Sequence, residues 1–376
     1  MTETAYTGAR IFDGTRLHDG LALVLSDGRV TALRPDTEIR DLERVDLGGG
    51  ILAPGLVDLQ VNGGGGVMLN DHPDVRTLRV MAEAHGRLGS TTIVPTLITD
   101  TREVTLAAID AIDAAIAEGV PGVGGLHLEG PHLDPAKAGA HDPALIRPMD
   151  DADLAMLVAA ARRLPTLIVT LAPGAATPDQ IGQLRDAGAI VSLGHSAASY
   201  EEAASAVAAG ASMVTHLYNA MSQLGHRSPG LVGAALDRDL WAGIIADGVH
   251  VHPAALRIAV VAKPQRLFLV SDAMAVAGTD ATRFTLNGRE ITRSDGRLTL
   301  EDGTLAGADL DLPRAMRMLL SAGSRVENAL ALATSRPADA IGRGDLGYLQ
   351  PGSRGDMVHL SDDLDLRQVW RAGQPI

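Results

Sequence analysis

The sequence predicts a (β/α)8 TIM-like barrel with a small β-sandwich domain built from both chain ends. Eight short apolar runs alternate with Ala-rich amphipathic segments through the middle of the chain, and both flanks carry strand-like runs separated by Asp-Gly or Asn-Gly turns. Four of the central runs also end in a residue that can bind a metal or transfer a proton. Eight parallel strands close such a barrel, and its active sites lie at the carboxyl ends of the strands.

Composition narrows the class of protein. The chain has 376 residues, 46% of them hydrophobic, which is enough for a large core and an additional domain. It has no cysteine, so a metal site must use His and carboxylates, and the absence of disulfides favours the cytoplasm. The net charge of −14 disfavours nucleic acid as a partner. No apolar run reaches the roughly 18 residues of a membrane span, and no signal peptide is visible.

Short strands at the two ends predict the sandwich. Asp-Gly between apolar runs is a strong hairpin signal. The early strands are expected at 5–12, 21–26, 30–34 and 44–46, and the late ones at 285–291, 298–300 and 357–360. We therefore assign 1–52 and 344–376, with strands from about 284–304, to the sandwich, and 53–343 to the barrel.

The barrel strands are expected at eight successive apolar runs. These are 56–62, 92–97, 123–129, 167–172, 190–195, 213–217, 242–247 and 267–272, with helices over 104–118, 151–163, 178–187 and 200–209. Such near-continuous apolar strands are typical of a parallel sheet covered on both faces. The alternative, an open doubly wound sheet, would carry a Gly-rich phosphate turn after its first strand. The glycines at 63–66 do not form that G-x-G-x-x-G pattern, so the barrel is preferred.

Four polar residues stand at the ends of predicted barrel strands: Glu129, His195, His216 and Asp272. A lone strand-end histidine is usually structural or exposed. Glu with two His is nevertheless a common ligand set for one catalytic metal, with a position left for water. Asp272 adds a carboxylate that could transfer a proton. His127 is expected on the same strand face as Glu129 but deeper in the barrel, as a packing or supporting residue.

Several longer motifs occur in one order along the chain. They are PGLVDLQVNG (54–63), HLEGP (127–131), GHS (194–196), THLYNAM (215–221), SDAM (271–274) and LAG (305–307). Together they resemble the N-acetylglucosamine-6-phosphate deacetylase family of the amidohydrolase superfamily, over nearly the whole chain. The resemblance implies that Asp272 is the general acid and base of the reaction. It also implies that His141 is a catalytic residue that polarises the acetyl carbonyl or grips the sugar.

The residue types at the expected metal positions also indicate how many metals the site binds. The superfamily usually carries His-x-His at the end of the first barrel strand, whereas this chain has Gln60 and Asn62 at that vestigial first-metal position. Amide oxygens are poor ligands for a first-row dication. The only lysines, Lys137 in a loop and Lys263 before Pro264, are not placed to bridge two metals. We expect one divalent metal per subunit on Glu129, His195 and His216, with zinc preferred over iron, cobalt or manganese.

Substrate contacts are expected from loops that follow the strands. Arg227 is the natural counter-charge for a phosphate, because a guanidinium can hold two oxygens at once. Further contacts are expected from His141, from His250 and from the backbone N–H groups of Asn219 and Ala220. Relatives usually have Glu where this chain has Ser228, so Arg227 lacks a carboxylate neighbour. In the family this arginine can come from the adjacent subunit, which implies a homodimer with the phosphate site near the interface.

The expected function is hydrolysis of the acetamide of N-acetyl-D-glucosamine 6-phosphate to D-glucosamine 6-phosphate and acetate. One alternative is a related amidohydrolase that deacylates another N-acyl amine, such as an unphosphorylated N-acetyl amino sugar or an N-acyl amino acid. Another is a non-catalytic sugar-phosphate binding protein. Without the resemblance, His141, Arg227 and His250 would be interpreted as solvated loop residues.

Overall fold

The computed structural model describes residues 3–376 and contains the predicted barrel. Eight parallel strands form one sheet in sequential order. They are β8 (Leu56–Val61), β11 (Ser90–Ile98), β12 (Leu126–Glu129), β13 (Leu167–Leu171), β14 (Ile190–Leu193), β15 (Met213–Val214), β16 (Trp241–Ile244) and β17 (Leu267–Leu269). Each predicted barrel strand overlaps one of these strands, so the fold class is confirmed.

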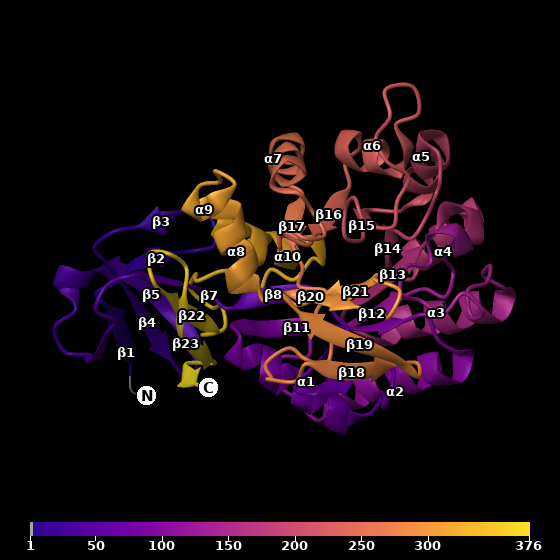
Figure 1. Ribbon diagram of the computed structural model, residues 1–376. Helices are drawn as coiled ribbons and strands as arrows, with labels where there is room; N and C mark the ends of the chain where they lie inside the picture. Colours follow the sequence, from indigo (N-terminus) through magenta and orange to yellow (C-terminus); the bar gives the residue numbers. More distant parts are fainter. Residues whose placement is uncertain (1–2) are drawn as a thin grey trace.

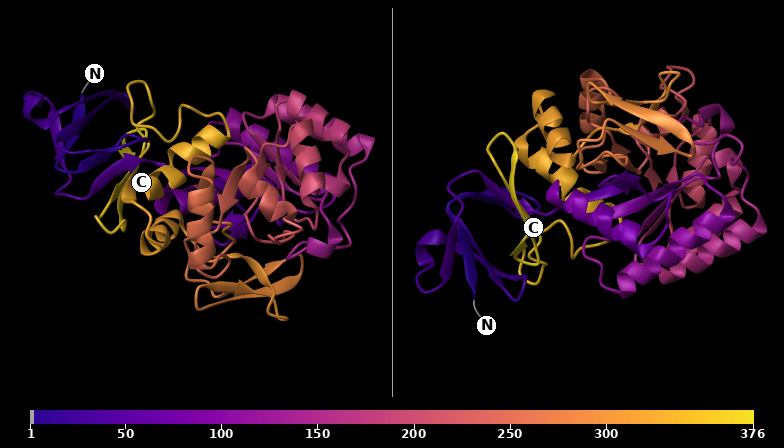
Figure 2. Two further views of the ribbon diagram at one scale, coloured as in Figure 1. Left: turned by 90° about the horizontal axis from the view of Figure 1, so that it is seen from above. Right: turned by 60° about the horizontal axis from the view of Figure 1, so that its bottom comes forward.

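Helices surround the barrel (Figures 1 and 2). They are α1 (Val75–Arg87), α2 (Arg102–Ala117), α3 (Asp151–Arg163), α4 (Pro178–Asp186), α5 (Tyr200–Ala209), α6 (Gly230–Asp237), α7 (Pro253–Ala262), α8 (Leu312–Ser321), α9 (Val326–Ala333) and α10 (Ser335–Ala340). The starts of α3, α4 and α5 are specified by capping boxes, in which Asp150, Thr177 and Ser199 bond reciprocally with the residue three positions later. These signals explain why the predicted helix boundaries were close to the observed ones.

The ring closes between the first and last strands near their carboxyl ends. The backbone N–H of Asp272 donates to Gln60 O at 3.0 Å, and that of Asn62 donates to Ala273 O at 2.9 Å. A parallel bridge joins Val61 to Ala273. The seam between β8 and β17 therefore lies at the face of the barrel where active sites are built.

Both ends of the chain meet in a small lobe at the side of the barrel (Figure 1). One sheet has the order β5 (Arg29–Pro35), β4 (Leu21–Ser26), β1 (Thr4–Thr7), β6 (Glu43–Asp46). The other has the order β24 (Gln374–Pro375), β23 (Leu366–Arg371), β22 (Met357–Leu360), β7 (Ile51–Pro54), β2 (Arg10–Phe12), β3 (Leu17–His18). Tyr6, Leu23 and Trp370 contribute to the hydrophobic core of this lobe.

The expectation that strands from about 284–304 belong to the sandwich is wrong. β18 (Arg283–Leu286), β19 (Arg289–Ser294), β20 (Arg297–Thr299) and β21 (Leu305–Ala308) form a separate antiparallel sheet. Its apolar side chains pack with Met68, Ile98 and Met274 of the barrel. The Asn-Gly and Asp-Gly turns specify which strands pair locally, but they do not specify which surface the hairpins cover.

This inserted sheet reaches the catalytic face through β21. The Ala308 N–H donates to Asp272 O at 2.9 Å. A side chain at Gly307, whose φ is +66°, would lie 2.4 Å from Met274 Cγ, so only glycine allows this close approach. Within residues 3–376, no helix is long and apolar enough to cross a membrane.

Candidate active site

Three of the four predicted strand-end residues lie just beyond the strands, in an unusual backbone conformation. β12 ends at Glu129 itself, whereas His195, His216 and Asp272 follow the ends of β14, β15 and β17. Their φ angles are +44°, +28° and +50°. Residues other than glycine rarely adopt this left-handed region, which costs about 1–3 kcal/mol. The strain turns each side chain inward, over the end of the barrel.

Three ligand-type atoms converge at this point. Glu129 Oε1 lies 3.1 Å from His195 Nε2 and 2.9 Å from His216 Nε2, and the two nitrogens are 3.0 Å apart. All three residues are buried. The contacts with the two histidines outweigh burial, which would raise the pKa of Glu129, and hold that pKa well below its ordinary value.

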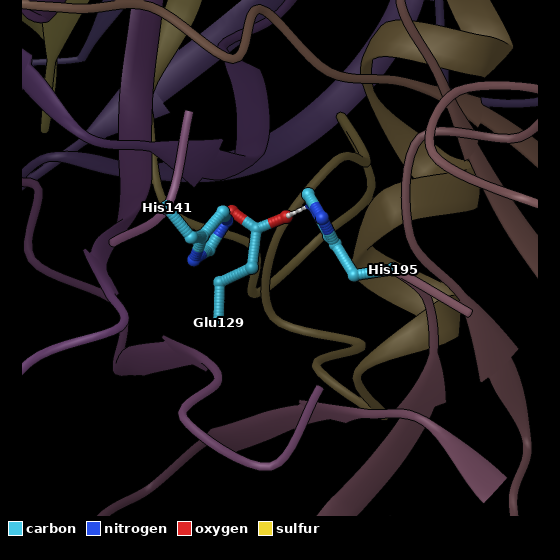
Figure 3. Close-up of side chains that lie close together, drawn as sticks. All are labelled: Glu129, His141 and His195. Atoms are coloured by element: carbon cyan, nitrogen blue, oxygen red, sulfur yellow. Dashed lines mark hydrogen bonds and ion pairs between the residues drawn. The ribbon is translucent and has the colours of Figure 1, made fainter. Parts of the chain in front are cut away.

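His141 also approaches the cluster from the loop after β12. Ligand atoms of Glu129, His141 and His195 all lie within 4.8 Å of one another, and Figure 3 shows the three side chains facing one another. The His141 and His195 rings meet edge to face at a centroid distance of 4.3 Å. Two overlapping sets could therefore hold a metal, one completed by His216 and the other by His141.

The second ring nitrogen distinguishes the roles of His195 and His141. His195 Nδ1 is 2.8 Å from the carbonyl oxygen of Lys137, which can only accept, so Nδ1 carries a proton and, in the neutral ring, Nε2 keeps a lone pair. His141 Nδ1 is 3.2 Å from the backbone N–H of Thr99, which can only donate. Nδ1 of His141 is thus unprotonated, and its neutral ring presents an N–H at Nε2. Burial, helped by nearby His195, lowers the pKa of His141 to about 3, which keeps the ring neutral.

This geometry fits a divalent cation held by Glu129, His195 and His216. When His195 is neutral, its Nε2 carries a lone pair, and His216 Nε2 then supplies at most one proton for the three contacts among the ligand atoms. One proton cannot satisfy all three contacts, whereas a cation bound to the three atoms does. His141 is better suited to donate a hydrogen bond than to bind metal.

Asp272 lies beside this cluster, 8% exposed. Burial, followed by the negative charge of Glu129, raises the pKa of Asp272 to about 6. Its Oδ1 accepts hydrogen bonds from Asn62 Nδ2 at 2.7 Å and Gln60 Nε2 at 3.2 Å. A carboxylate with a pKa near neutrality is suited to proton transfer.

His127 lies below the cluster. Its Nε2 is 2.7 Å from Thr170 Oγ1, and its Nδ1 is 3.4 Å from Thr96 Oγ1. Burial lowers its pKa to about 4. Both ring nitrogens have hydroxyl partners, as expected of a supporting residue in the barrel interior.

The cluster lines a cavity of about 260 Å³ that the inserted sheet helps to enclose. Of the predicted site residues, it includes Asn62, Glu129, His141, His195, His216, Asn219, Ala220, His250 and Asp272. Leu286, Thr304 and Leu305 complete part of the wall from the inserted sheet. A larger cavity of about 380 Å³ lies nearby, but it contains none of the ligand side chains.

The structure does not bring Arg227 into this cavity. Arg227 and its neighbour His226 are exposed in the loop before α6, and no ion pair to Arg227 occurs among residues 3–376. The N–H of Asn219 is bonded to His216 O at 3.0 Å, while that of Ala220 has no protein partner in the described chain. Ala220 is therefore the better backbone donor for a ligand.

Sequence reasoning missed Asp247, which orients His250. One carboxylate oxygen accepts the N–H groups of Val249 and His250, both at 2.8 Å, and the other is 2.6 Å from His250 Nδ1. The Asp-Gly pair after a barrel strand was the available signal, because such an Asp often bonds to backbone N–H groups that follow it. Nothing in the sequence pointed to Thr99, whose backbone N–H donates to His141 Nδ1 and so leaves the His141 proton on Nε2.

Comparisons with known proteins agree with this architecture. The model of the Amidohydrolase family matches residues 51–376. An N-acetylgalactosamine-6-phosphate deacetylase of Shewanella sp. (strain ANA-3) is 42% identical, over 98% of this chain and 94% of the relative. The N-acetylglucosamine-6-phosphate deacetylase of Homo sapiens is 39% identical, over 88% of this chain and 85% of the relative.

Solved structures are similar over the whole length. N-acetylglucosamine-6-phosphate deacetylase from Pasteurella multocida superposes with a TM-score of 0.96 at 33% identity, covering 100% of this chain and 99% of that one. A mutant of the Mycobacterium smegmatis enzyme in complex with N-acetyl-D-glucosamine-6-phosphate gives a TM-score of 0.91 at 30% identity, covering 100% and 98%. With this match of family, fold and length, the chain belongs to the amidohydrolase family.

Proposed function

We infer that the protein hydrolyses the acetamide of N-acetyl-D-glucosamine 6-phosphate to D-glucosamine 6-phosphate and acetate. The observation that carries this inference is the buried cluster of Glu129, His195, His216 and Asp272, in a fold that matches deacetylases of this name along its full length. A protein that only bound sugar phosphates would not need a proton-transfer group beside a metal-binding cluster.

Glu129, His195 and His216 would hold one divalent cation, and we propose zinc. When bound there, the cation supplies Lewis-acid polarisation and a water of lowered pKa. Imidazole and carboxylate ligands with an open position are typical of catalytic zinc sites. The side chains Gln60 and Asn62 replace the histidines that would complete a second site.

Asp272 would accept a proton from the attacking water as the water oxygen bonds to the acetyl carbon. It would then deliver that proton to the amine nitrogen as the C–N bond breaks, which releases acetate and the amino sugar. His141 would donate its Nε2 hydrogen to the carbonyl oxygen as negative charge develops there. Thr99 supports this role because its backbone N–H keeps the His141 proton on Nε2.

The rest of the substrate would contact His250, held by Asp247, and the free N–H of Ala220. Since Arg227 lies outside the cavity of its own subunit, we propose that it binds the phosphate in the cavity of a neighbouring subunit. This arrangement requires a homodimer with the phosphate site near the interface. We place the protein in the cytoplasm, where a cysteine-free chain needs no disulfides.

N-acetylgalactosamine 6-phosphate is a second candidate substrate. Two relatives named for that activity are 42% and 37% identical to this chain, against 39% for the human N-acetylglucosamine-6-phosphate enzyme. The two sugars differ only at the C4 hydroxyl, away from the acetamide, so the same catalytic residues would serve both. Other N-acyl amines without phosphate are less favoured, because they give no role to Arg227.

The test is acetate release from both phosphorylated sugars and from unphosphorylated N-acetylglucosamine, with and without a chelator. Turnover of at least one phosphorylated sugar, lost on chelation, is expected. Equal turnover of the unphosphorylated sugar would contradict the assignment of a sugar phosphate as substrate.

Arg227→Ala separates the phosphate role from the chemistry. It should raise KM for the phosphorylated sugar about tenfold or more while leaving KM for the unphosphorylated sugar unchanged, because a charge-assisted bond contributes about 1.5–3 kcal/mol. Mixing Arg227→Ala with an Asp272→Asn variant tests the neighbouring subunit. Mixed dimers should recover activity only if Arg227 acts across the interface.

A further inference from the structure

Gln60 connects the two buried carboxylates of the site, Glu129 and Asp272, and Asn62 bonds to Asp272. Gln60 Nε2 lies 3.1 Å from Glu129 Oε2 and 3.2 Å from Asp272 Oδ1. Asn62 Nδ2 lies 2.7 Å from the same Oδ1. Both amides are buried, with exposures of 2% and 1%. Ionised carboxylates only accept hydrogen bonds, so the NH2 end of each amide must face them.

These bonds distinguish the two oxygens of each carboxylate, because only one of the two accepts from an amide group. Gln60 takes Oε2 of Glu129, which leaves Oε1 for the two histidine nitrogens. The amides together take Oδ1 of Asp272, and Oδ2 has no partner among residues 3–376. One oxygen of each carboxylate is thereby anchored, and the other is directed to the reaction.

Glu129 and Asp272 also need positive partners, because two buried carboxylates repel each other. Neither has an Arg or Lys within ion-pair distance in the described chain. The Gln60 amide N–H groups lie between Glu129 and Asp272, and those of Asn62 face Asp272. They oppose the repulsion without adding charge.

The amides cannot move away easily, because the backbone beneath them is fixed. Asp272 N–H bonds to Gln60 O at 3.0 Å. The buried carboxylate of Asp58, on the same strand as Gln60, accepts the N–H groups of Ser271 at 3.2 Å and Gln60 at 3.3 Å. Gln60 lies on β8 and Asn62 directly follows its last residue, and both side chains reach Asp272 Oδ1.

We propose that Gln60 and Asn62 are positioning residues whose amide groups replace a second cation, and that they are functional and not vestigial. They hold Oε1 of Glu129 toward the histidines and Oδ2 of Asp272 toward the substrate. The proposal rests on the proposed function in its roles for Glu129 and Asp272. It adds that removal of one amide donor creates a requirement for a second cation.

The decisive variant is Asn62→Asp, which keeps the shape of the side chain and replaces the donor with a third carboxylate. Metal-depleted protein is titrated with Zn²⁺ or Mn²⁺ while bound metal, thermal midpoint and acetate release are followed. Wild type should bind one equivalent per chain. The variant should bind two, lose at least 100-fold in kcat with one equivalent, and regain at least tenfold with the second, together with a higher thermal midpoint.

Asn70→Asp is the matched control. Asn70 is another buried amide, which donates to Ile98 O at 3.1 Å and Asp100 Oδ2 at 2.9 Å. It does not itself line the catalytic cavity, although Ile98 does. A general effect of placing a charge in the core would lower stability in both variants. Only Asn62→Asp should acquire a second tightly bound cation and recover activity with it.

Gln60→Met keeps the proposal testable if Asn62→Asp does not fold. Loss of the anchor on Glu129 Oε2 should weaken binding of the first cation at least tenfold. Unchanged affinity would overturn the proposal. Two tightly bound cations per chain in the wild-type protein would also overturn it. So would an Asn62→Asp variant whose kcat with one equivalent of cation is within threefold of the wild-type value. A second equivalent that neither binds to this variant nor restores its activity would do the same. Cation stoichiometry needs no substrate, so an error in the proposed substrate would appear only in the wild-type acetate assay.

Discussion

The small sandwich lobe and the barrel shift the pKa of one aspartate each, Asp13 and Asp58, in opposite directions. In the lobe, burial alone would raise the pKa of Asp13, but bonds from His18, Thr15 and Arg16 outweigh it and bring the pKa to about 2. Below the catalytic face, burial raises the pKa of Asp58 to about 7 despite its backbone bonds. The surroundings of Asp13 in the lobe stabilise its ionised form, whereas those of Asp58 in the barrel favour its protonated form.

Positive φ at residues other than glycine occurs in both regions. In the lobe, Leu364 and Ala372 have φ angles of +64° and +46°. In the lobe, Asp27 has a φ of +49° in an Asp-Gly turn, where Asp is well tolerated. Around the catalytic cavity, His195, His216, Tyr218, Ala220 and Asp272 all have positive φ, and of these Tyr218 and Ala220 belong to residue types that rarely adopt it. Five such residues around one cavity, together with buried charge, indicate a region shaped for function at the expense of stability.

The largest expected effect is that of the Asp272→Asn substitution at the catalytic face. The variant should lose about 10²–10⁴-fold in kcat, since this is the usual contribution of a general acid or base. It should still retain its cation, because Asp272 is not among the converging ligand atoms. Parallel assays of acetate release and bound metal check both parts. Turnover close to that of wild type would exclude Asp272 as the proton-transfer group.

A second test compares how the unfolding free energies of the Asp58→Asn and Asp13→Asn variants depend on pH. The folded-state pKa of Asp58 is raised, so its favourable contribution is complete below pH 3.8 and is lost as pH rises to about 7. Relative to wild type, Asp58→Asn should therefore gain unfolding free energy between pH 4 and 7, by at most roughly 4 kcal/mol.

The folded-state pKa of Asp13 is lowered, so its contribution is present above pH 3.8 and is lost as pH falls through about 2. Asp13→Asn should accordingly be less stable than wild type at neutral pH, and this deficit should shrink in acid. Chemical denaturation at several pH values measures both series. Parallel pH profiles for the two variants would contradict the contrast.

The smallest effect concerns backbone strain. Ala220→Gly should raise the unfolding free energy by roughly 0.5–1 kcal/mol, because glycine adopts positive φ without steric cost. Asp27→Gly in the lobe should change it by less than about 0.5 kcal/mol. Thermal unfolding of the two variants provides the comparison. A stability gain of the same size at both sites would show that the catalytic loops are no more strained than an ordinary turn.

Much of the fold was predictable because its signals are local. Apolar runs marked all eight barrel strands, and capping residues marked the helix starts. The inserted sheet was misplaced because hairpin signals specify pairing between neighbouring strands only. Arg227 could be named as a candidate from its charge, but its exposed position outside the cavity was not visible in the sequence.

The sequence by itself determined the barrel and the converging strand ends, with Gln60 and Asn62 at the end of the first barrel strand. Those properties depend on residue type and spacing along one chain. Only the tertiary structure decided the proton positions on His195 and His141, because these depend on Lys137 O and the Thr99 N–H, which come from other loops. It also decided that Gln60 joins Glu129 to Asp272 and that Asn62 anchors Asp272, since the ends of β8, β12 and β17 meet only in the closed barrel.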